Sequence, residues 1–435
     1  MRSLALISAV LSLGCSAAGS AATVTFYRAV APILQRHCQS CHRAGEAAPM
    51  SFESYTQVRP WAKAIKQAVV TRRMPPWFAD PALGHFRNAR RLSEQEIATL
   101  QAWVDGGAAA GDPADAPPAV AYTPGWGIGP PDVVLEMPAP VTIPAAGKID
   151  YQYVIVPTGF TEDRWVRAVE ARPGNRALTH HVIAFVRPLG SRFARSMPPG
   201  RVFTLDELPP EERGGMSSAE WLVGYAPGVP PEIYPEDQAK FIPAGSDLIL
   251  QLHYTATGQA GQDQSKIGLV FAPTAPRERV VTIPAQTTRF VIPPGAEHHE
   301  VRFRFTFHGD AKLLAMAPHM HARGKGMTVR LVPPEGDPVE LLQMRWDFNW
   351  QLFYELADPL LVRAGSRLEA VAIFDNSANN PFNPDPSAEV RWGEQTWEEM
   401  AMCILSVAVD ARRDPRELLR PLHRPASTTA AGVPE

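Results

Sequence analysis

Residues 247–255 read DLILQLHYT, a short apolar run between segments that carry Pro and Gly. Runs of this length with turn residues on both sides are typical of β-strands. Further runs of the same kind follow residue 132: YQYVIV at 151–156, HVIAFV at 181–186, EVRFRFTF at 300–307 and RLEAVAIF at 367–374. Many short strands separated by turns predict all-β sandwich domains of jelly-roll type. The runs fall into two groups around residues 272–279, so we expect two sandwiches, at 132–274 and 275–413.

The composition of the chain agrees with a β-rich protein. The 435 residues include 44 prolines, roughly double the usual share. Because proline breaks helices, its abundance disfavours a mainly helical protein. A hydrophobic content of 45%, with 18 Phe, is enough for packed cores and excludes wholesale disorder. The formal net charge of -3 lacks the basic surplus that a nucleic-acid or anionic-membrane partner requires, so neither partner is expected.

Residues 23–112 have a different pattern, which predicts a small all-α domain before the two sandwiches. Apolar side chains recur at helical spacing in three segments, 26–37, 61–73 and 94–105. Ser93 and Glu96 predict a capping box at the start of the third segment. Residues 113–131 are rich in Ala, Pro, Gly and Asp, and they predict a linker to the first sandwich.

The two ends of the chain are predicted to lie outside these domains. Residues 1–22, with Arg2 followed by an apolar run and small residues, are typical of an export signal, so we expect an exported, periplasmic protein. The apolar run is too short to span a bilayer, and no later segment predicts a transmembrane helix. Cys15 leaves a lipid anchor as an alternative, although Ser12 stands where lipoprotein processing usually needs Leu. Residues 414–435 are Pro-rich and predict a loose tail.

The segment CQSCH at residues 38–42 fits the C-x-x-C-H signature of covalently bound c-type haem. Two thiols at this spacing, Cys38 and Cys41, reach the two vinyl groups of one porphyrin, and His42 supplies an axial nitrogen to the iron. A redox dithiol does not require the His, and a zinc site of four cysteines lacks its second Cys pair. Cys403 is left without a partner and is predicted to be a buried small hydrophobe.

Three side chains are candidates for the sixth haem ligand. Met74 is preferred, because the two prolines after it predict an extended loop that presents the thioether. Met50 and His85 stay as alternatives. A Met/His ligand pair raises the haem potential and suits electron transfer. With its C-x-x-C-H motif, three helical segments and downstream Met, the region 23–112 resembles a small class I-like cytochrome c domain.

The histidines after the linker form groups that predict metal sites. His319 and His321 are two residues apart, so in a strand both rings lie on one face and can share one metal ion. His180 and His181 are adjacent, so a regular strand would send them to opposite faces. Both can bind one metal only at a strand end or bulge, or through different ring nitrogens. His253 comes late in an apolar strand, on the face that it shares with Ile249 and Gln251.

The order of these groups along the chain is an HH pair, a single His, an HxH pair and then a Met after acidic residues. This order resembles the copper type II, ascorbate-dependent monooxygenases, the family of peptidylglycine α-hydroxylating monooxygenase and dopamine β-monooxygenase. The resemblance implies that the first sandwich binds one copper through three His: His180, His181 and His253. It implies that the second binds another copper through an HxH pair and a Met: His319, His321 and Met400. Met402 stays as an alternative sulfur ligand. Imidazole suits copper, and a thioether favours Cu(I), whereas zinc gives the Met no purpose.

The chain departs from this family where the peptide-hydroxylating relative binds its substrate. Ala317 stands in place of an Arg that helps hold the substrate carboxylate, and Ile404 stands in place of a contributing Tyr. The family's disulfides cannot form with the four cysteines present. A C-terminal glycine peptide is therefore not the expected substrate. The remaining pair, His298 and His299, follows a Pro-Pro-Gly turn, has no third partner nearby in sequence and is not expected to bind metal.

These features predict an exported copper-dependent monooxygenase that hydroxylates a C–H bond of a small organic substrate with O2. The resemblance implies that the copper at His319, His321 and Met400 is the catalytic one and that the three-His copper passes on the second electron. The fused haem c suggests a replacement for ascorbate, in which an external one-electron donor reduces the haem and the haem reduces the three-His copper. The alternative is a non-catalytic copper- and haem-binding electron-transfer protein. A copper nitrite reductase is disfavoured, because no His lies beside Cys403 to build a site of two His and one Cys.

Overall fold

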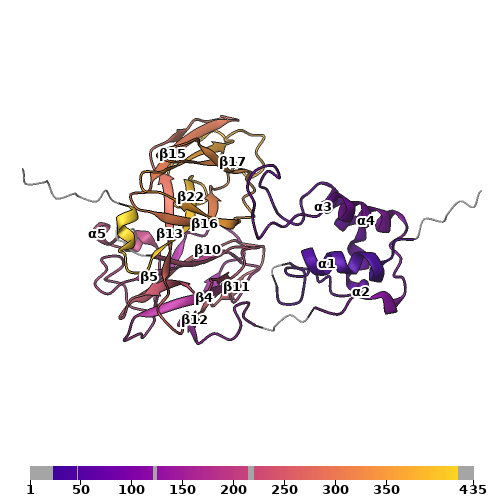
Figure 1. Cartoon of the computed structure of the whole chain (residues 1–435), viewed down its shortest axis with the longest axis horizontal. Helices are drawn as coiled ribbons and strands as arrows, with labels where there is room; N and C mark the ends of the chain where they lie inside the picture. The colour runs from indigo at the N-terminus through magenta and orange to yellow at the C-terminus, as the bar shows by residue number, and fades with distance from the viewer. Residues whose placement is uncertain (1–22, 47, 121–124, 214–219, 420–435) are drawn as a thin grey trace, which may run out of the picture.

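The computed structural model describes residues 23–46, 48–120, 125–213 and 220–419. Within these ranges the chain is mostly β-sheet with few helices, and Figure 1 shows most of the helices at one end and the strands at the other. The predicted export signal at 1–22, with Cys15, and residues 420–435 of the predicted tail lie outside the described residues. None of the helices in the described ranges is long and apolar enough to cross a membrane.

The helices that precede the first strand are short: η1 (Phe26–Val30), α1 (Ala31–His37), α2 (Tyr55–Val58), η2 (Arg59–Trp61), α3 (Ala62–Val70), α4 (Glu94–Asp105) and η3 (Pro113–Asp115). The capping box predicted for α4 is confirmed, because the side chains and backbone N–H groups of Ser93 and Glu96 bond reciprocally. α3 ends earlier than its apolar pattern, since Arg72 has a φ of 53°, which a helix does not allow. Leu100 and Trp103 are fully buried where these helices meet.

The strands fall into two consecutive groups. The first group runs to residue 271 and includes two short helices: β1 (Val133–Glu136), β2 (Val141–Ile143), β3 (Gln152–Pro157), β4 (Arg164–Arg172), β5 (Thr179–Arg187), β6 (Val202–Phe203), η4 (Leu205–Glu207), α5 (Pro210–Arg213), β7 (Glu220–Tyr225), β8 (Glu232–Ile233), β9 (Gln238–Ile242), β10 (Asp247–Tyr254), β11 (Gly261–Asp263) and β12 (Lys266–Phe271). The second group starts at residue 278: β13 (Glu278–Thr287), β14 (Val291–Ile292), β15 (His299–Thr306), β16 (Ala311–His319), β17 (Gly324–Val332), β18 (Val339–Arg345), β19 (Tyr354–Val362), β20 (Arg367–Phe374), β21 (Val390–Arg391), β22 (Ala401–Asp410) and η6 (Pro415–Leu418).

One sheet runs through both groups of strands. Its order is β1-β12-β4-β9-β13-β22-β16-β19, with β8 beside β4, and the two groups join where β9 and β13 pair in parallel. A five-stranded sheet of the first group (β6-β3-β10-β5-β7) and a four-stranded sheet of the second (β15-β20-β17-β18) pack on this long sheet. The sequence predicted two sandwiches but not that they share a continuous sheet, because the β9–β13 pairing joins segments about 40 residues apart.

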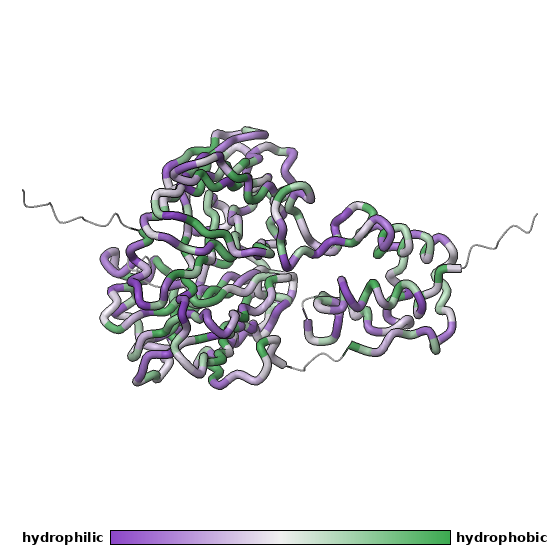
Figure 2. Tube along the Cα trace, viewed as in Figure 1, coloured by the Kyte–Doolittle hydropathy of each residue, from purple (hydrophilic) through white to green (hydrophobic). Residues whose placement is uncertain are grey.

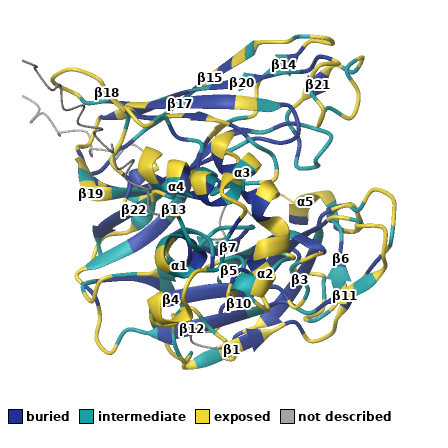
Figure 3. Cartoon of the chain, turned by 90° about the vertical axis from the view of Figure 1, so that its right-hand side faces the viewer, coloured by how far each residue is buried: buried dark blue, intermediate teal, exposed yellow. Residues whose placement is uncertain are grey.

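Two hydrophobic cores lie between these sheets, and Figures 2 and 3 show the apolar, buried strands that enclose them. Alternate residues of each strand enter a core, as the two-residue period of a strand requires. Leu248, Leu250 and Leu252 of β10 enter the core of the first group. Cys403 and Leu405 of β22 enter the core of the second, which confirms the prediction that Cys403 is buried. The residues that alternate with these on β10 and β22 therefore face away from the cores.

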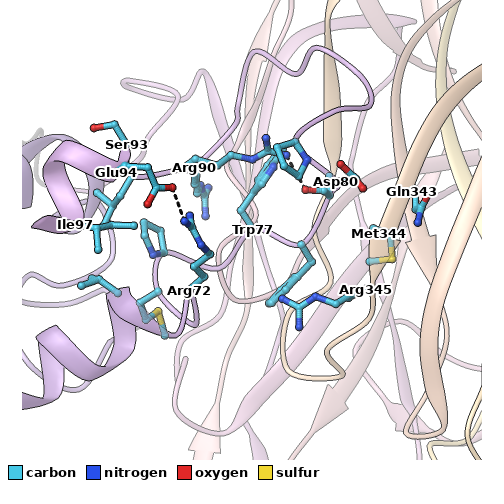
Figure 4. A pocket seen from close by; sticks show the side chains of 18 residues that line it. Arg72, Trp77, Asp80, Arg90, Ser93, Glu94, Ile97, Gln343, Met344 and Arg345 are labelled. Atoms are coloured by element: carbon cyan, nitrogen blue, oxygen red, sulfur yellow. Dashed lines mark hydrogen bonds and ion pairs between the residues drawn. The ribbon is translucent and has the colours of Figure 1, made fainter.

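The helical part is attached to the second group of strands by residues 77–91, here called the strap segment. Ala79 bridges to Met344 of β18 and Phe86 bridges to Leu356 of β19. Trp77 and Phe86 pack edge-on against Tyr354, with ring centroids 5.0 and 5.5 Å away. A cavity of about 730 Å³ lies at this junction. Figure 4 shows it between the Arg72–Glu94 ion pair on the helical side and Arg345 on the strand side, and its described lining contains no histidine.

Candidate metal centres

The first histidine cluster forms where β5 and β10 lie side by side. His181 lies directly opposite His253 in the antiparallel register. The register then shifts, so that Tyr254 pairs with Thr179 and His180 is left without an opposing residue. This irregularity is the bulge that two adjacent ligands require, because it removes the strict alternation of faces. The structure thus brings His180, His181 and His253 together, and their ligand atoms lie within 4.8 Å of one another.

The ring nitrogens of this cluster have the spacing of metal ligands. The Nδ1 atom of His181 lies 3.4 Å from the Nδ1 of His180 and 3.4 Å from the Nδ1 of His253. Two nitrogens bound at ~2.0 Å to one tetrahedral metal ion lie about 3.3 Å apart. The Nε2 of His253 lies 3.1 Å from the hydroxyl of Thr396, which holds the ring in place from the segment before β22. The three side chains therefore fit a metal ion bound through Nδ1 atoms.

Burial keeps all three imidazoles in the neutral form that binds metals. Desolvation lowers the pKa of His180 to about 4. Desolvation, and then the neighbouring imidazoles, lower the pKa of His181 and His253 well below the usual histidine range. The rings of His319 and His321 are among the groups that lower both of these pKa values, so the second histidine pair lies within electrostatic reach.

The second cluster forms at the end of β16. His319 is its last residue and His321 follows two residues later, with ring centroids 5.3 Å apart. The Nδ1 of His319 lies 3.0 Å from the Gln351 side-chain oxygen, and the Nδ1 of His321 lies 3.1 Å from the Glu398 carbonyl oxygen. Both contacts place the proton on Nδ1 and leave the Nε2 lone pair for a ligand. Within the described residues the Nε2 of His321 is buried and has no hydrogen-bond partner.

Both candidate sulfurs lie beside this pair. Met402 of β22 lies opposite His319 of β16, and Met400 is the residue directly before β22. Side chains that are opposite in an antiparallel pair have Cβ atoms about 5 Å apart on the same face. Met400 and Met402 both line the cavity next to the histidines. The choice of Met400 as the ligand stays a prediction.

One cavity of about 470 Å³ joins the two clusters, because it is lined by His181 of the first cluster and by His319, Met400 and Met402 of the second. It lies between the strand faces that point away from the two cores. β5 and β10 contribute Ile183, Phe185 and Gln251 on one side, and β16 and β22 contribute Ala317 and Ile404 on the other. Lys and Arg are missing from its described lining, and Glu394 is the only carboxylate there. The cavity therefore suits an uncharged, largely apolar molecule.

The C-x-x-C-H motif lies beside a separate apolar cavity of about 440 Å³, which is lined by Cys38, Cys41 and His42 of the helical part and also by Pro227 and Trp350. Both thiols are free, and burial raises the pKa of Cys38 to about 12, so it is a neutral thiol. The His42 ring stacks on Phe52 at 4.2 Å, and its Nδ1 lies 3.3 Å from the Met50 carbonyl oxygen. This contact occupies Nδ1, so Nε2 is the ring nitrogen that remains available as a ligand. Two free thiols, an oriented imidazole and an apolar cavity fit a covalently bound haem.

The other residues singled out from the sequence are distributed as follows. Met74 and Met50 both line the cavity beside Cys38, so both stay candidates for the sixth haem ligand. His85 is absent from its described lining. His298 is exposed and lies 3.6 Å from the Glu300 carboxylate, and within the described residues it belongs to no group of potential metal ligands.

Several residues that support the clusters had no recognisable signal in the sequence. Gln351, Thr396 and Glu398 orient the histidine rings from segments far along the chain. The buried Glu399 carboxylate accepts the backbone N–H groups of His321 and Arg323. Glu398 and Glu399 are the exception, because they form the acidic pair that precedes Met400 in the order of motifs.

No known protein-family model matches the chain, and no curated protein matches its sequence. Among solved structures, the major capsid protein P2 of bacteriophage PM2 is 11% identical, with a TM-score of 0.26 over 64% of this chain and 97% of that one. PNGF-II is also 11% identical, with a TM-score of 0.26 over 64% of each chain. The allantoicase of Saccharomyces cerevisiae is 9% identical, with a TM-score of 0.15 over 53% of this chain and 77% of that one. Scores this low carry no argument about function.

Proposed function

We propose that the chain is an exported copper-dependent monooxygenase, which hydroxylates a C–H bond of a small organic substrate with O2. The observation that carries this proposal is the single apolar cavity that both histidine clusters line. An electron carrier has no need of a cavity large enough for a substrate between its metals. A hydroxylating enzyme needs such a cavity, because substrate, O2 and metal must meet there without bulk water.

The donor sets fit two copper ions. His180, His181 and His253 would hold one ion, and His319, His321 and Met400 would hold the other. Copper at these positions would supply one-electron chemistry, and the thioether at the second position would favour the Cu(I) form that meets O2. The residues around the ligands hold and orient them: Gln351 and the Glu398 carbonyl fix the tautomers of the HxH pair, and Thr396 fixes the ring of His253.

The cavity lining selects the substrate. Ala317 and Ile404 present only apolar surface beside the HxH pair, where a carboxylate-binding clamp would need Arg and Tyr. Trp221, Phe185 and Phe353 add aromatic surface. Because a buried carboxylate without a positive partner costs several kcal/mol, an anionic substrate is disfavoured. We therefore assign the substrate to uncharged, apolar or aromatic molecules.

The helical part would supply the electrons. Cys38 and Cys41 would attach the two vinyl groups of haem c, and His42 and Met74 would be its axial ligands. Hydroxylation by O2 consumes two electrons and two protons, and it yields one alcohol and one water. An external one-electron donor would deliver these electrons one at a time through the haem.

The test is oxygen uptake by the copper- and haem-loaded full chain during a screen of apolar and aromatic substrates, with 18O2 as the isotope source. We expect substrate-dependent uptake, with one labelled oxygen atom in the hydroxylated product. His319→Ala should abolish it. His298→Ala is the matched control, since it removes an exposed imidazole outside both clusters, and it should leave uptake unchanged. Reversible reduction and oxidation without substrate-dependent uptake would instead identify a copper and haem electron carrier.

A further inference from the structure

The loop between β18 and β19, residues 346–353 with the sequence WDFNWQLF, lies against all three candidate centres. Trp350 lines the cavity beside Cys41 and His42. Phe348 stacks on the ring of His180, with centroids 4.8 Å apart and planes inclined by 21°. Gln351 contacts the Nδ1 of His319 at 3.0 Å. Two aromatic side chains, two residues apart in sequence, thus reach the haem cavity and the three-His cluster.

We infer that this loop carries the electron from the haem to the three-His copper, entering at Trp350 and leaving through Phe348. The inference rests on the proposed function for the identity of both centres. One electron leaves the ferrous haem, which becomes ferric, and arrives at the cupric ion at His180, His181 and His253, which becomes cuprous. This one-electron transfer requires no proton and no further reactant. An external one-electron donor returns the haem to the ferrous state.

The loop is held at both ends, so its aromatic side chains keep their positions. Trp346 donates from Nε1 to the His321 carbonyl oxygen at 3.0 Å, and the Phe353 carbonyl oxygen accepts a hydrogen bond from Asn88 of the strap segment at 2.8 Å. Between them, the Trp350 backbone N–H bonds to the Asp347 carbonyl oxygen at 2.9 Å. These contacts tie the loop to the HxH pair and to the helical part at once.

A glycine lets Trp350 approach the opposite wall of the junction. Gly228 has a φ of +85°, and a Cβ atom there would lie 3.3 Å from the Trp350 ring and 3.1 Å from the Arg90 guanidinium. Pro227, the residue before it, lines the haem cavity together with Trp350. The indole therefore packs into the wall of the cavity in which the haem would sit, rather than facing open solvent.

A second set of contacts ties the segment after the C-x-x-C-H motif to the first group of strands. Glu46, shortly after the motif, forms an ion pair with Arg176 of the β4–β5 connection. Arg43 also pairs with Glu46, at 3.0 Å. Arg176 lines the haem cavity and precedes His180 by four residues, so this ion pair anchors the haem-binding segment to the connection that leads into the three-His cluster.

Tyr225 is the competing route. It lines the cavity that contains His181, and it also lines a smaller one that contains Cys41. The guanidinium of Arg176 lies 5.8 Å from the centre of its ring. Phe348 stacks directly on the metal-ligand candidate His180, whereas Tyr225 shares a cavity lining with His181, so we assign the transfer to the loop.

The experiment measures electron transfer within the full chain loaded with haem and Cu(II), without O2 or substrate. A photochemical one-electron donor reduces the haem in a flash, and haem absorbance then reports its reoxidation by copper. Trp350→Leu should slow this reoxidation about tenfold or more. Leu leaves empty space where the indole was, and empty space has no packed atoms to couple the two centres. Trp350→Phe should restore most of the rate, and Phe348→Leu should slow it comparably. The haem spectrum and reduction potential of Trp350→Leu should match the wild type.

Trp165→Leu is the matched control, because Trp165 of β4 packs on Phe241, with ring centroids 4.6 Å apart, and is absent from the described lining of the haem cavity. It should leave the transfer rate unchanged. An unchanged rate in Trp350→Leu, or an equal loss in Trp165→Leu, would overturn the inference. The inference would also be overturned if haem reoxidation were slow in Tyr225→Leu alone, or if the wild type showed no copper-dependent haem reoxidation. The proposed monooxygenase activity would survive any of these results, since a small artificial reductant can test it without the haem.

Discussion

Glu399→Gln should weaken the second copper site although the two side chains have nearly the same shape. Glu399 is fully buried, and its carboxylate accepts the backbone N–H of His321 at 2.8 Å and that of Arg323 at 2.6 Å. Burial raises the pKa of the Glu399 carboxyl to about 8, so its attraction for the guanidinium of Arg323, a residue that is only 1% exposed, is fully present only above that pH. Because an amide has a single acceptor oxygen, Gln must leave one of the two N–H groups facing another donor.

The size of the effect follows from these contacts. A buried N–H without a partner costs ~1–3 kcal/mol. Because the Glu399 carboxyl has a pKa of about 8, it is mostly neutral at pH 7, and the loss of its charge adds little there. Arg323 also keeps hydrogen bonds to the Asn376 side chain at 2.7 Å and the Trp397 carbonyl at 2.9 Å. We expect Glu399→Gln to lower the free energy of unfolding at pH 7 by about 2 kcal/mol. Copper affinity at the HxH pair should fall ~10–100-fold, as for other residues that orient metal ligands.

Urea unfolding of the metal-free protein measures the first quantity, and copper titration measures the second. Glu389→Gln is the control, because Glu389 is exposed, and it should change the free energy of unfolding by less than ~0.5 kcal/mol. Copper binding at the three-His cluster should be retained in both variants. If Glu399→Gln unfolds at the same urea concentration as the wild type, the carboxylate does not satisfy the two N–H groups, and the reasoning is refuted.

Four further variants test the copper donor sets and the haem. Met400→His should keep copper at the second site but depress hydroxylation by removing the thioether that favours Cu(I), whereas Met402→Leu should leave hydroxylation nearly intact and cost under about 1.5 kcal/mol of stability; X-ray absorption of the reduced protein that loses its copper–sulfur signal only in Met402→Leu would show that Met402 is the ligand. His253→Ala should lower bound copper from two ions to one per chain, as measured by metal analysis, with the Met-containing site retained; loss of both would contradict two separate donor sets. His42→Ala should abolish turnover driven by a reduced cytochrome while a small artificial reductant still supports it, and full cytochrome-driven activity in haem-deficient protein would contradict the assigned haem role.

Much of the secondary structure could be predicted because its signals are local. The apolar spacing of residues 94–105 and the Ser93/Glu96 cap need no distant partner, and α4 has the predicted bounds. The run at 247–255 became β10, with alternate leucines in the core. The end of α3 could not be predicted from periodicity, since the turn at Arg72 depends on how the strap segment leaves the helix.

The sequence by itself determined which side chains are available: a C-x-x-C-H motif, an HH pair, a single His, an HxH pair and two methionines in a fixed order. Only the tertiary structure decided that His180 and His181 share a side, because the bulge opposite His253 is a property of the β5–β10 register. The register of distant strands likewise opened one cavity onto both clusters and laid residues 346–353 against the haem cavity. Such contacts join residues far apart in sequence, so they depend on the packing of whole sheets and leave no local pattern to read.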